Sequence, residues 1–448
     1  MSVSPCNQSN CCTPVFFSNS QQQELLQIIN QLNQAILSFF TTPNPTTRQI
    51  LQTALQALND LLIAVQPNTP NRNLVLRTIN QLINSLPTAT LTQISALFQF
   101  LFQNLSSLIS CSNISDPLLQ QTFSLILQGV LNSSLLNITG TTGPGCNFLV
   151  YATNAGAIDD PADDTVSVIN TGTNTVVDTI TVDNAPLEVA VSPNGTRAYV
   201  TNIFSNTVSV IDTATNTVIA TIPVGANPIG VAVSPNNTTV YVGNHGNNTV
   251  SVINAATNTV VGTINVGIAP QGITVSPNGS LAYVANELSN TISVIATATN
   301  TVVGTINVGI RPRIIVFTLD GTRAYVTNQN SNTVSVINTA TNSVIDTINV
   351  GTEPVGIAIT PDGARIYVVN KVSNNVSVIS TLTNTVIDTI PVALSPDQVT
   401  IIPDGTRAYV TNQASNTVSV INTATNTVID TVPVGVAPTG IATGFICE

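Results

Sequence analysis

The chain has 448 residues, only 7% of which are charged, and its formal net charge of −11 lies entirely after residue 140. This length allows two or three domains, and the acidic surplus argues against nucleic acid and anionic membranes as partners. No run of sequence approaches the roughly 20 consecutive apolar residues that a membrane span requires.

The first 19 residues are rich in Ser, Asn and Pro and are predicted to form a flexible tail. Three of the six cysteines, Cys6, Cys11 and Cys12, lie in this tail. The start has neither the basic nor the apolar region of a secretory signal peptide, so none is predicted. The cysteines still favour an oxidising destination. A protein without a visible signal peptide can still reach an oxidising environment if its producing cell lyses, or if a signal peptide has been removed from the sequence.

Residues 20–138 are predicted to form an all-α bundle of five helices. Leu, Ile and Phe recur three or four residues apart, with Gln and Asn on the opposite face. Asn44 before Pro45 and Thr69 before Pro70 are typical of helix starts. The expected helices cover residues 20–41, 46–65, 70–86, 90–110 and 116–136. A segment rich in Gly, Thr and Pro at 139–146 is the predicted linker.

The rest of the chain, 147–448, is built from a repeat of 42 residues. Six tyrosines from Tyr199 to Tyr409 follow one another at this interval, Tyr151 precedes them, and a proline recurs in step from Pro186 to Pro438. Each repeat holds four short apolar runs, which is typical of a propeller blade. The sequence therefore predicts an N-terminal helical bundle followed by a seven-bladed, all-β propeller.

One phrase of the repeat, Tyr-Val-Thr-Asn, begins at Tyr199, Tyr325 and Tyr409, with close variants at the other four tyrosines. In this phrase the chain resembles the YVTN family of β-propeller repeat proteins, over residues 148 to 444. The resemblance implies a bacterial or archaeal protein, often at a surface, whose repeat carries no shared catalytic residue. The cysteine-bearing, lysine-poor N-terminal region is similar to outer-layer proteins of bacterial spores.

The propeller is expected to close by pairing its two ends. The chain enters at 148–151 as a second strand and leaves at 440–443 as a first strand, so the last segment completes the first blade. This alignment puts Cys146 and Cys447 at the turn between strands one and two, and it predicts a disulfide between them. Closing a loop of about 300 residues stabilises the fold by about 5 kcal/mol in the chain-entropy model. Two neighbouring free thiols are the alternative.

The remaining cysteines are predicted to act in anchoring or assembly: Cys6, Cys11, Cys12 and Cys111. One partner inside the bundle cannot satisfy three tail cysteines, so at least one thiol is expected to link to another chain or a host layer. A zinc site is the alternative, although the spacing is unusual for zinc.

An acidic insertion in the first blade is the second candidate metal site. Its carboxylates could offer oxygen ligands to calcium: Asp159, Asp160, Asp163 and Asp164. A solvated acidic loop is the alternative, because the spacing is not that of an EF-hand. No other cofactor is expected.

The repeats differ most in the loops that join strand four to strand one and strand two to strand three. The face carrying these loops is therefore the candidate binding surface. Its irregular residues are Glu188, Phe204, His245, Glu287, Arg311, Arg313, Glu353, Lys371 and Asp397. A ligand or protein partner there is one interpretation, and an unengaged solvated rim is the other. No catalytic residue is assigned, because the single histidine has no repeated carboxylate or serine beside it.

The leading hypothesis is a non-enzymatic surface or structural protein, extracellular and displayed on a bacterial spore. Its helical domain would anchor or assemble it through protein partners or self-association, and its propeller would serve adhesion or form a protective layer. A ligand- or protein-binding module is the second hypothesis, and a channel-centred, lyase-like enzyme is the third. Ionisable groups converging at the channel mouth would favour the enzyme, whereas a flat, amide-rich contact made by the helices would favour assembly.

Overall fold

The computed structural model describes residues 16–41, 44–65, 70–86, 147–156 and 163–446, together with residues 94, 98, 101, 102, 105, 108, 109 and 114. The chain divides into two compact units, Met1–Gly145 and Cys146–Glu448. The six cysteines lie outside the described residues: Cys6, Cys11, Cys12, Cys111, Cys146 and Cys447. Their predicted disulfides and intermolecular links therefore stay predictions.

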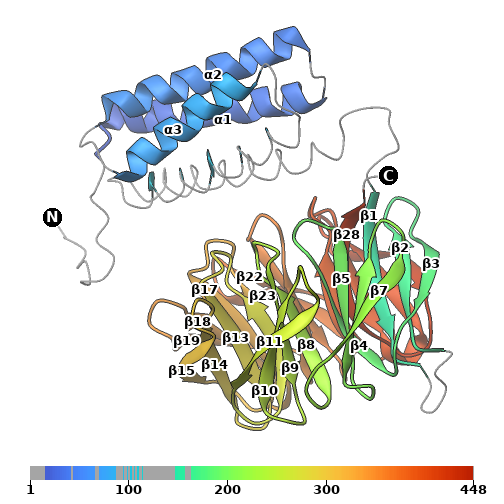
Figure 1. Ribbon diagram of the computed structural model, residues 1–448. Helices are drawn as coiled ribbons and strands as arrows, with labels where there is room; N and C mark the ends of the chain where they lie inside the picture. The colour runs from blue at the N-terminus through green and yellow to red at the C-terminus, as the bar shows by residue number, and fades with distance from the viewer. Residues whose placement is uncertain are drawn as a thin grey trace. The chain divides into compact units, whose positions relative to one another are not determined.

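Three helices of the first unit are described: α1 (Asn19–Thr41), α2 (Pro45–Ala64) and α3 (Pro70–Ser85) (Figure 1). They agree with the first three predicted helices to within one residue at each end. The side chain of Asn44 accepts hydrogen bonds from two backbone amides of the first turn, which caps α2 immediately before its proline. The apolar faces of the three helices meet in one buried core.

The fourth and fifth predicted helices, 90–110 and 116–136, fall almost entirely outside the described residues, so a five-helix bundle is not confirmed. Eight isolated apolar residues between Ile94 and Ile114 are described, and their side chains belong to the same buried core. Among the helices that the structure describes, none is both long enough and apolar enough to cross a membrane.

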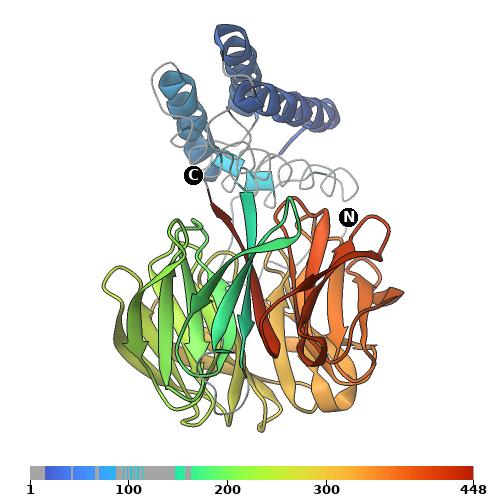
Figure 2. The same ribbon diagram turned by 90° about the vertical axis from the view of Figure 1, so that its right-hand side faces the viewer.

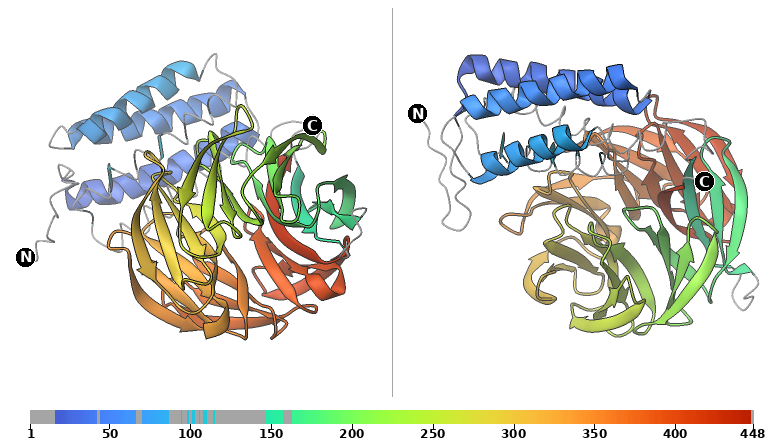
Figure 3. Two further views of the ribbon diagram at one scale, coloured as in Figure 1. Left: turned by 60° about the horizontal axis from the view of Figure 1, so that its bottom comes forward. Right: turned by 45° about the horizontal axis from the view of Figure 1, so that its top comes forward.

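The described part of the second unit forms seven four-stranded antiparallel sheets around a ring (Figures 1 and 3). The middle strands, such as β5 (Arg197–Asn202), are buried on both faces because each blade packs against two neighbours. Outer strands such as β7 (Thr217–Pro223) are mostly exposed to solvent. The prediction of a seven-bladed, all-β propeller is confirmed.

From the inner to the outer strand, the first three blades are β28 (Pro438–Ile446), β1 (Asn147–Asn154), β2 (Thr165–Asn170), β3 (Thr175–Thr181); β4 (Pro186–Val191), β5, β6 (Thr207–Asp212), β7; and β8 (Pro228–Val233), β9 (Thr239–Asn244), β10 (Thr249–Asn254), β11 (Thr259–Asn265). The next two are β12 (Pro270–Val275), β13 (Leu281–Asn286), β14 (Thr291–Ala296), β15 (Thr301–Asn307); and β16 (Pro312–Phe317), β17 (Arg323–Asn328), β18 (Thr333–Asn338), β19 (Ser343–Asn349). The last two are β20 (Pro354–Ile359), β21 (Arg365–Asn370), β22 (Asn375–Ser380), β23 (Thr385–Pro391); and β24 (Pro396–Ile401), β25 (Arg407–Asn412), β26 (Thr417–Asn422), β27 (Thr427–Pro433). Two short 3₁₀ turns, Gln329–Ser331 and Gln413–Ser415, follow β17 and β25.

The ring closes as the sequence predicted, with β28 paired antiparallel to β1 (Figure 2, red beside green). The register places Val150 opposite Thr443, and Asn147 opposite Ile446. This pairing covers the edge of β1 that would otherwise be free and makes the first blade four-stranded like the others. Asn147 and Ile446 are the sequence neighbours of the two cysteines that are predicted to form the disulfide.

The repeated tyrosines fasten each blade to the next. Their rings are fully buried, and the hydroxyl of Tyr325, for example, donates to the side chain of Asn384 in the following blade at 2.8 Å. Asn384 has a positive φ of 51°, a turn conformation that asparagine tolerates well. Tyr409 makes the equivalent bond to Asn174 at 2.9 Å, from the seventh blade to the first. The sequence repeat therefore yields a rigid ring.

Candidate functional site

The candidate site lies at one end of the propeller channel, where the inner strands begin. A cavity of about 90 Å³ is found there, enough for several water molecules. The second and third residues of the inner strands line it: Leu187, Glu188, Ile229, Gln271, Arg313, Ile314, Val355, Asp397, Gln398 and Thr439. The blades thus contribute their least repetitive residues to one small volume.

Glycine occupies the third position of four inner strands and brings neighbouring strands close together. A Cβ on Gly230 would lie 2.1 Å from the carbonyl oxygen of Gln271, and one on Gly440 would lie 2.3 Å from that of Leu187. Side chains are present at this position in only three of the described inner strands, as Glu188, Ile314 and Gln398. The glycines let neighbouring inner strands approach closely, and the side chains of Glu188, Ile314 and Gln398 line the cavity.

Glu188 is one of the two carboxylates that line this cavity, and Asp397 is the other. Its side chain accepts a hydrogen bond of 2.7 Å from the amide of Gln398, a residue 210 positions away that ring closure brings beside it. Burial raises the pKa of Glu188 to about 7, and the nearby charge of Asp397 adds to this effect. The Gln398 bond and the charge of Arg313 oppose it without cancelling it. Glu188 therefore gains and loses a proton near neutral pH.

Glu287, in the loop after β13, is the second carboxylate of the mouth, and its side chain is only 3% exposed. It accepts hydrogen bonds from Gln271 at 2.5 Å, from Arg311 at 2.7 Å and from His245 at 3.3 Å. Burial raises its pKa, but these three bonds and the charge of Arg313 outweigh burial and hold the pKa at about 2. Glu287 is a permanent anion that gathers cations around it.

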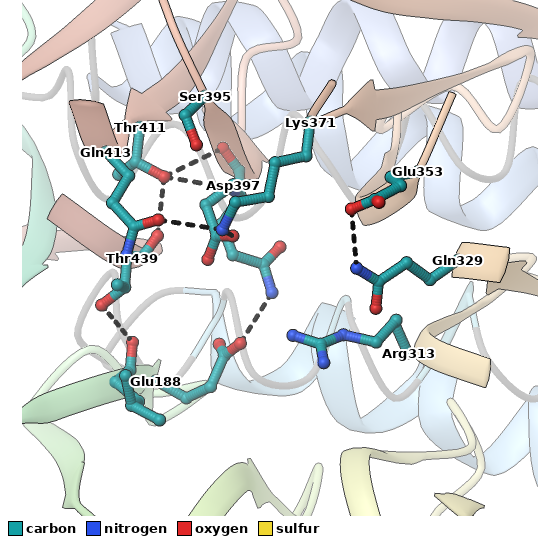
Figure 4. A network of polar contacts seen from close by, with 12 residues as sticks. Glu188, Arg313, Gln329, Glu353, Lys371, Ser395, Asp397, Thr411, Gln413 and Thr439 are labelled. Atoms are coloured by element: carbon teal, nitrogen blue, oxygen red, sulfur yellow. Dashed lines mark hydrogen bonds and ion pairs between the residues drawn. The ribbon is translucent and has the colours of Figure 1, made fainter. Parts of the chain in front are cut away.

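Arg313, on β16, lies between these two carboxylates. Its guanidinium is 3.9 Å from a carboxylate oxygen of Glu287, and in Figure 4 it points toward Glu188. The guanidinium also lines the cavity and lowers the pKa of Glu188 by its charge. A cation held in this way faces whatever binds beside Glu188.

A separate polar network lies on the blades that follow (Figure 4). The ammonium of Lys371 donates to Asp397 and to Gln413, at 2.9 Å each. Glu353 accepts a hydrogen bond of 3.1 Å from Gln329 and does not line the cavity.

Eight of the nine predicted surface residues fall into these three networks around the mouth. They are Glu188, His245, Glu287, Arg311, Arg313, Glu353, Lys371 and Asp397. Phe204 differs, because its side chain is 63% exposed and lies outside the cavity lining.

Four amides of these networks were missed: Gln271, Gln329, Gln398 and Gln413. Amides are abundant throughout this chain, so they do not stand out by residue type. Two of them could have been found by position, because Gln271 and Gln398 replace apolar residues or glycine at fixed places of the repeat.

The candidate calcium loop is described only in part. Asp163 and Asp164 are described, and Asp159 and Asp160 are not. Within the described residues, no three side chains of His, Cys, Asp or Glu are grouped as metal ligands. Calcium binding by this loop stays a prediction.

Three features of the mouth suit proton-transfer chemistry. A carboxyl group that titrates near pH 7 can act as base and as acid. A neighbouring guanidinium can stabilise negative charge that develops on a bound molecule. Both groups line the same small cavity, and the side chain of Arg313 stays 25% exposed.

Comparison with known proteins gives matches to seven-bladed propellers. The family described as lactonase, 7-bladed β-propeller, matches residues 172–307 and 299–429, more than half of the chain. No curated protein sequence is detectably similar.

Solved structures of low sequence identity share the fold. A proposed 6-phosphogluconolactonase of Bacteroides fragilis is 18% identical with a TM-score of 0.59, and the match covers 67% of this chain and 98% of that one. One from Bacteroides uniformis is also 18% identical, with a TM-score of 0.58 and coverage of 67% and 100%. Kuenenia stuttgartiensis hydrazine synthase is 22% identical, with a TM-score of 0.54 and coverage of 59% and 95%. At these identities the likeness shows the fold alone.

These findings correct the predicted function. The hypothesis of a non-enzymatic surface or structural protein is wrong, because the matching family is one of lactonases. The convergence of ionisable groups at the channel mouth, which was the feature expected of an enzyme, agrees with this correction. A β-propeller is confirmed, whereas neither the YVTN family nor a similarity to spore-layer proteins is found.

Proposed function

The chain belongs to the family of seven-bladed β-propeller lactonases, and we propose that the cavity at its channel mouth hydrolyses a lactone. The observation that carries the proposal is the placing of Glu188 beside Arg313 in one small cavity, with the pKa of Glu188 raised to about 7. Two structures of the same fold are proposed lactonases in their own right, which supports the same reaction class.

The hydrolysis needs a base, a site for negative charge and an acid. The ionised carboxylate of Glu188 takes a proton from a water molecule, whose oxygen attacks the carbonyl carbon of the lactone. The carbonyl oxygen becomes an oxyanion, which the guanidinium of Arg313 stabilises. The bond between the carbonyl carbon and the ring oxygen then breaks. The ring oxygen leaves with the proton held by Glu188, and the product is a hydroxy acid.

The surrounding groups prepare these two residues for their roles. The amide of Gln398 donates to one oxygen of Glu188, which orients the carboxyl group and leaves its other oxygen for water. Glu287 stays ionised beside Arg313, and its negative charge favours this position of the guanidinium. A base is most effective when its pKa lies near the working pH, as that of Glu188 does near neutrality.

The test is the hydrolysis of a panel of small lactones, followed by acid release at constant pH. The intact chain should hydrolyse at least one of them, and Glu188→Gln should lower kcat/KM by about 10²–10⁴-fold, because glutamine cannot take a proton. The activity of the intact chain should rise with pH through about 7, as Glu188 ionises.

Glu353→Gln is the matched control, because Glu353 is a carboxylate at the same mouth that does not line the cavity. It should keep the activity of the unaltered chain. Equal activities of the Glu188→Gln and Glu353→Gln variants would overturn the proposed role of Glu188. No hydrolysis of any lactone by the intact chain would overturn the proposed reaction.

A further inference from the structure

Lys371 is the single lysine of the chain, and it lies in the loop after β21. Its side chain is 27% exposed, and its ammonium donates at 2.9 Å to the carboxylate of Asp397. A second bond of 2.9 Å goes to the amide oxygen of Gln413, in the seventh blade. These two bonds hold the ammonium over the side of the mouth where β24 begins.

Asp397 connects this ammonium to the cavity. It lines the cavity together with Glu188, and its side chain is 16% exposed. The next residue of β24, Gln398, donates directly to Glu188. The side chain that touches Glu188 and the side chain held by Lys371 are therefore neighbours on one strand.

We propose that Lys371 is a positioning residue that controls when Glu188 carries charge, by neutralising Asp397 at the edge of the cavity. This inference rests on the proposed function, and it names the regulation of the same site. A carboxylate near another carboxylate disfavours its ionisation, whereas an ammonium bound to the first reduces that effect. Lys371 itself is not one of the residues that line the cavity, and within the described residues its ammonium bonds to Asp397 and Gln413 and not to Glu188.

The other charges around Glu188 do not replace this control. Arg313 lowers the pKa of Glu188 from the opposite side, and Glu287 balances Arg313. Glu353, next to Lys371 across the mouth, has its carboxylate bonded to Gln329. A change in the pair of Lys371 and Asp397 therefore alters the net charge next to Glu188.

The ionisation of Glu188 can be followed without any lactone. The chain has five glutamates, so labelling the glutamate side-chain carboxyl carbon with ¹³C gives five signals in a pH titration by NMR. The signal that Glu188→Gln removes is that of Glu188. The signal of Glu24, which lies in α1 of the other unit, serves as the internal reference for the titration of each variant.

Lys371→Met should move the midpoint of the Glu188 titration upward by about 0.5–1 pH unit, because Asp397 is left unneutralised. Lys371→Arg keeps the charge and should restore the midpoint. Asp397→Asn should lower the midpoint, and adding Lys371→Met to it should raise the midpoint by less than Lys371→Met does alone, because Asp397 no longer holds the ammonium in place.

An unchanged midpoint in Lys371→Met, or an equal upward shift in the Asp397→Asn background, would overturn the inference. Both results concern ionisation alone, so they stand whether or not a lactone is hydrolysed. A failure of the proposed function would instead show as an intact titration of Glu188 with no turnover. A changed tyrosine fluorescence spectrum would identify a variant that is not folded, and Lys371→Gln would then take its place in the same titration.

Discussion

Two carboxylates at one channel mouth behave in opposite ways. Glu287 accepts hydrogen bonds from Arg311, His245 and the amide of Gln271, and its pKa is held at about 2. Glu188 is bonded by a single amide, and its pKa is raised to about 7. Burial acts upward on both, so the number and charge of the donors decide the outcome.

This difference separates an anchoring residue from a reacting one. A carboxylate surrounded by donors is fixed in charge and position, which suits the holding of Arg313. A carboxylate with one neutral donor keeps a free oxygen and exchanges its proton near neutrality, which suits proton transfer. The mouth therefore combines a rigid half around Glu287 with a titratable half around Glu188.

The strongest test of the comparison is stability. Glu287→Gln should lower the free energy of unfolding of the propeller by about 2–4 kcal/mol, because it leaves the cations around position 287 without their buried partner. Urea unfolding followed by tyrosine fluorescence measures this change in the propeller alone, since all seven tyrosines lie there and the chain has no tryptophan.

Glu353→Gln is the control for this measurement, because Glu353 accepts one amide bond and no bond from a cation within the described residues. Glu353→Gln should lower the free energy of unfolding by less than about 1 kcal/mol. Equal losses in the two variants would show that the donors around Glu287 do not stabilise the fold, and the contrast between the halves would fail.

The second test is the pH dependence of stability, which should have opposite signs in the two halves. The folded-state pKa of Glu188 is about 7, above its ordinary value of 4.5, so its contribution to stability is complete below pH 4.5 and is lost as pH rises through 7. The pKa of Glu287 is lowered, so its contribution is present above pH 4.5 and is lost as pH falls toward 2.

Unfolding by urea at pH 5 and at pH 8 tests the upper window. The unaltered chain should lose about 2 kcal/mol between these values relative to Glu188→Gln, whose residue 188 does not titrate. If the two proteins keep the same difference in stability at both pH values, Glu188 does not titrate in this range, and its assignment as the base fails with it.

The smallest expected effect concerns the single donor of Glu188. Gln398→Leu removes the hydrogen bond that favours the ionised carboxyl group, so the pKa of Glu188 should rise by about 0.5–1 pH unit. The pH profile of kcat/KM should move upward by the same amount. Gln329→Leu, which removes the equivalent bond to Glu353, should leave the profile in place.

Much of the propeller could be predicted because its repeat is regular. The interval of 42 residues determines where strands begin. Because the chain enters the propeller as a second strand and leaves it as a first strand, β28 is expected to complete the blade of β1. The first three helices followed from their apolar spacing and from the proline starts after Asn44 and Thr69. Strong periodicity of this kind is the most reliable signal that a single sequence offers.

The site was predicted as a surface and not as a mechanism. The sequence assigns the residues that depart from the repeat to the loops of one face, and the structure brings eight of the nine around the mouth, although Glu188, Arg313 and Asp397 lie on inner strands. Their charges were treated one by one, however, and no partner could be assigned to any of them. The sequence shows no repeated partner beside His245 and therefore predicts no catalysis there, although Glu287, one blade further on, lies within hydrogen-bonding distance of its ring.

The sequence by itself determined the blades, their number and the way in which the ring closes, because these follow from local periodicity. Only the tertiary structure decided which irregular residues share a cavity, because closing the ring brings together blades that are far apart in the chain. Glu188 and Gln398 are 210 residues apart in the chain and 2.7 Å apart at the channel mouth. The pKa of Glu188 likewise depends on burial and on neighbours from other blades, which exist only once the ring is closed.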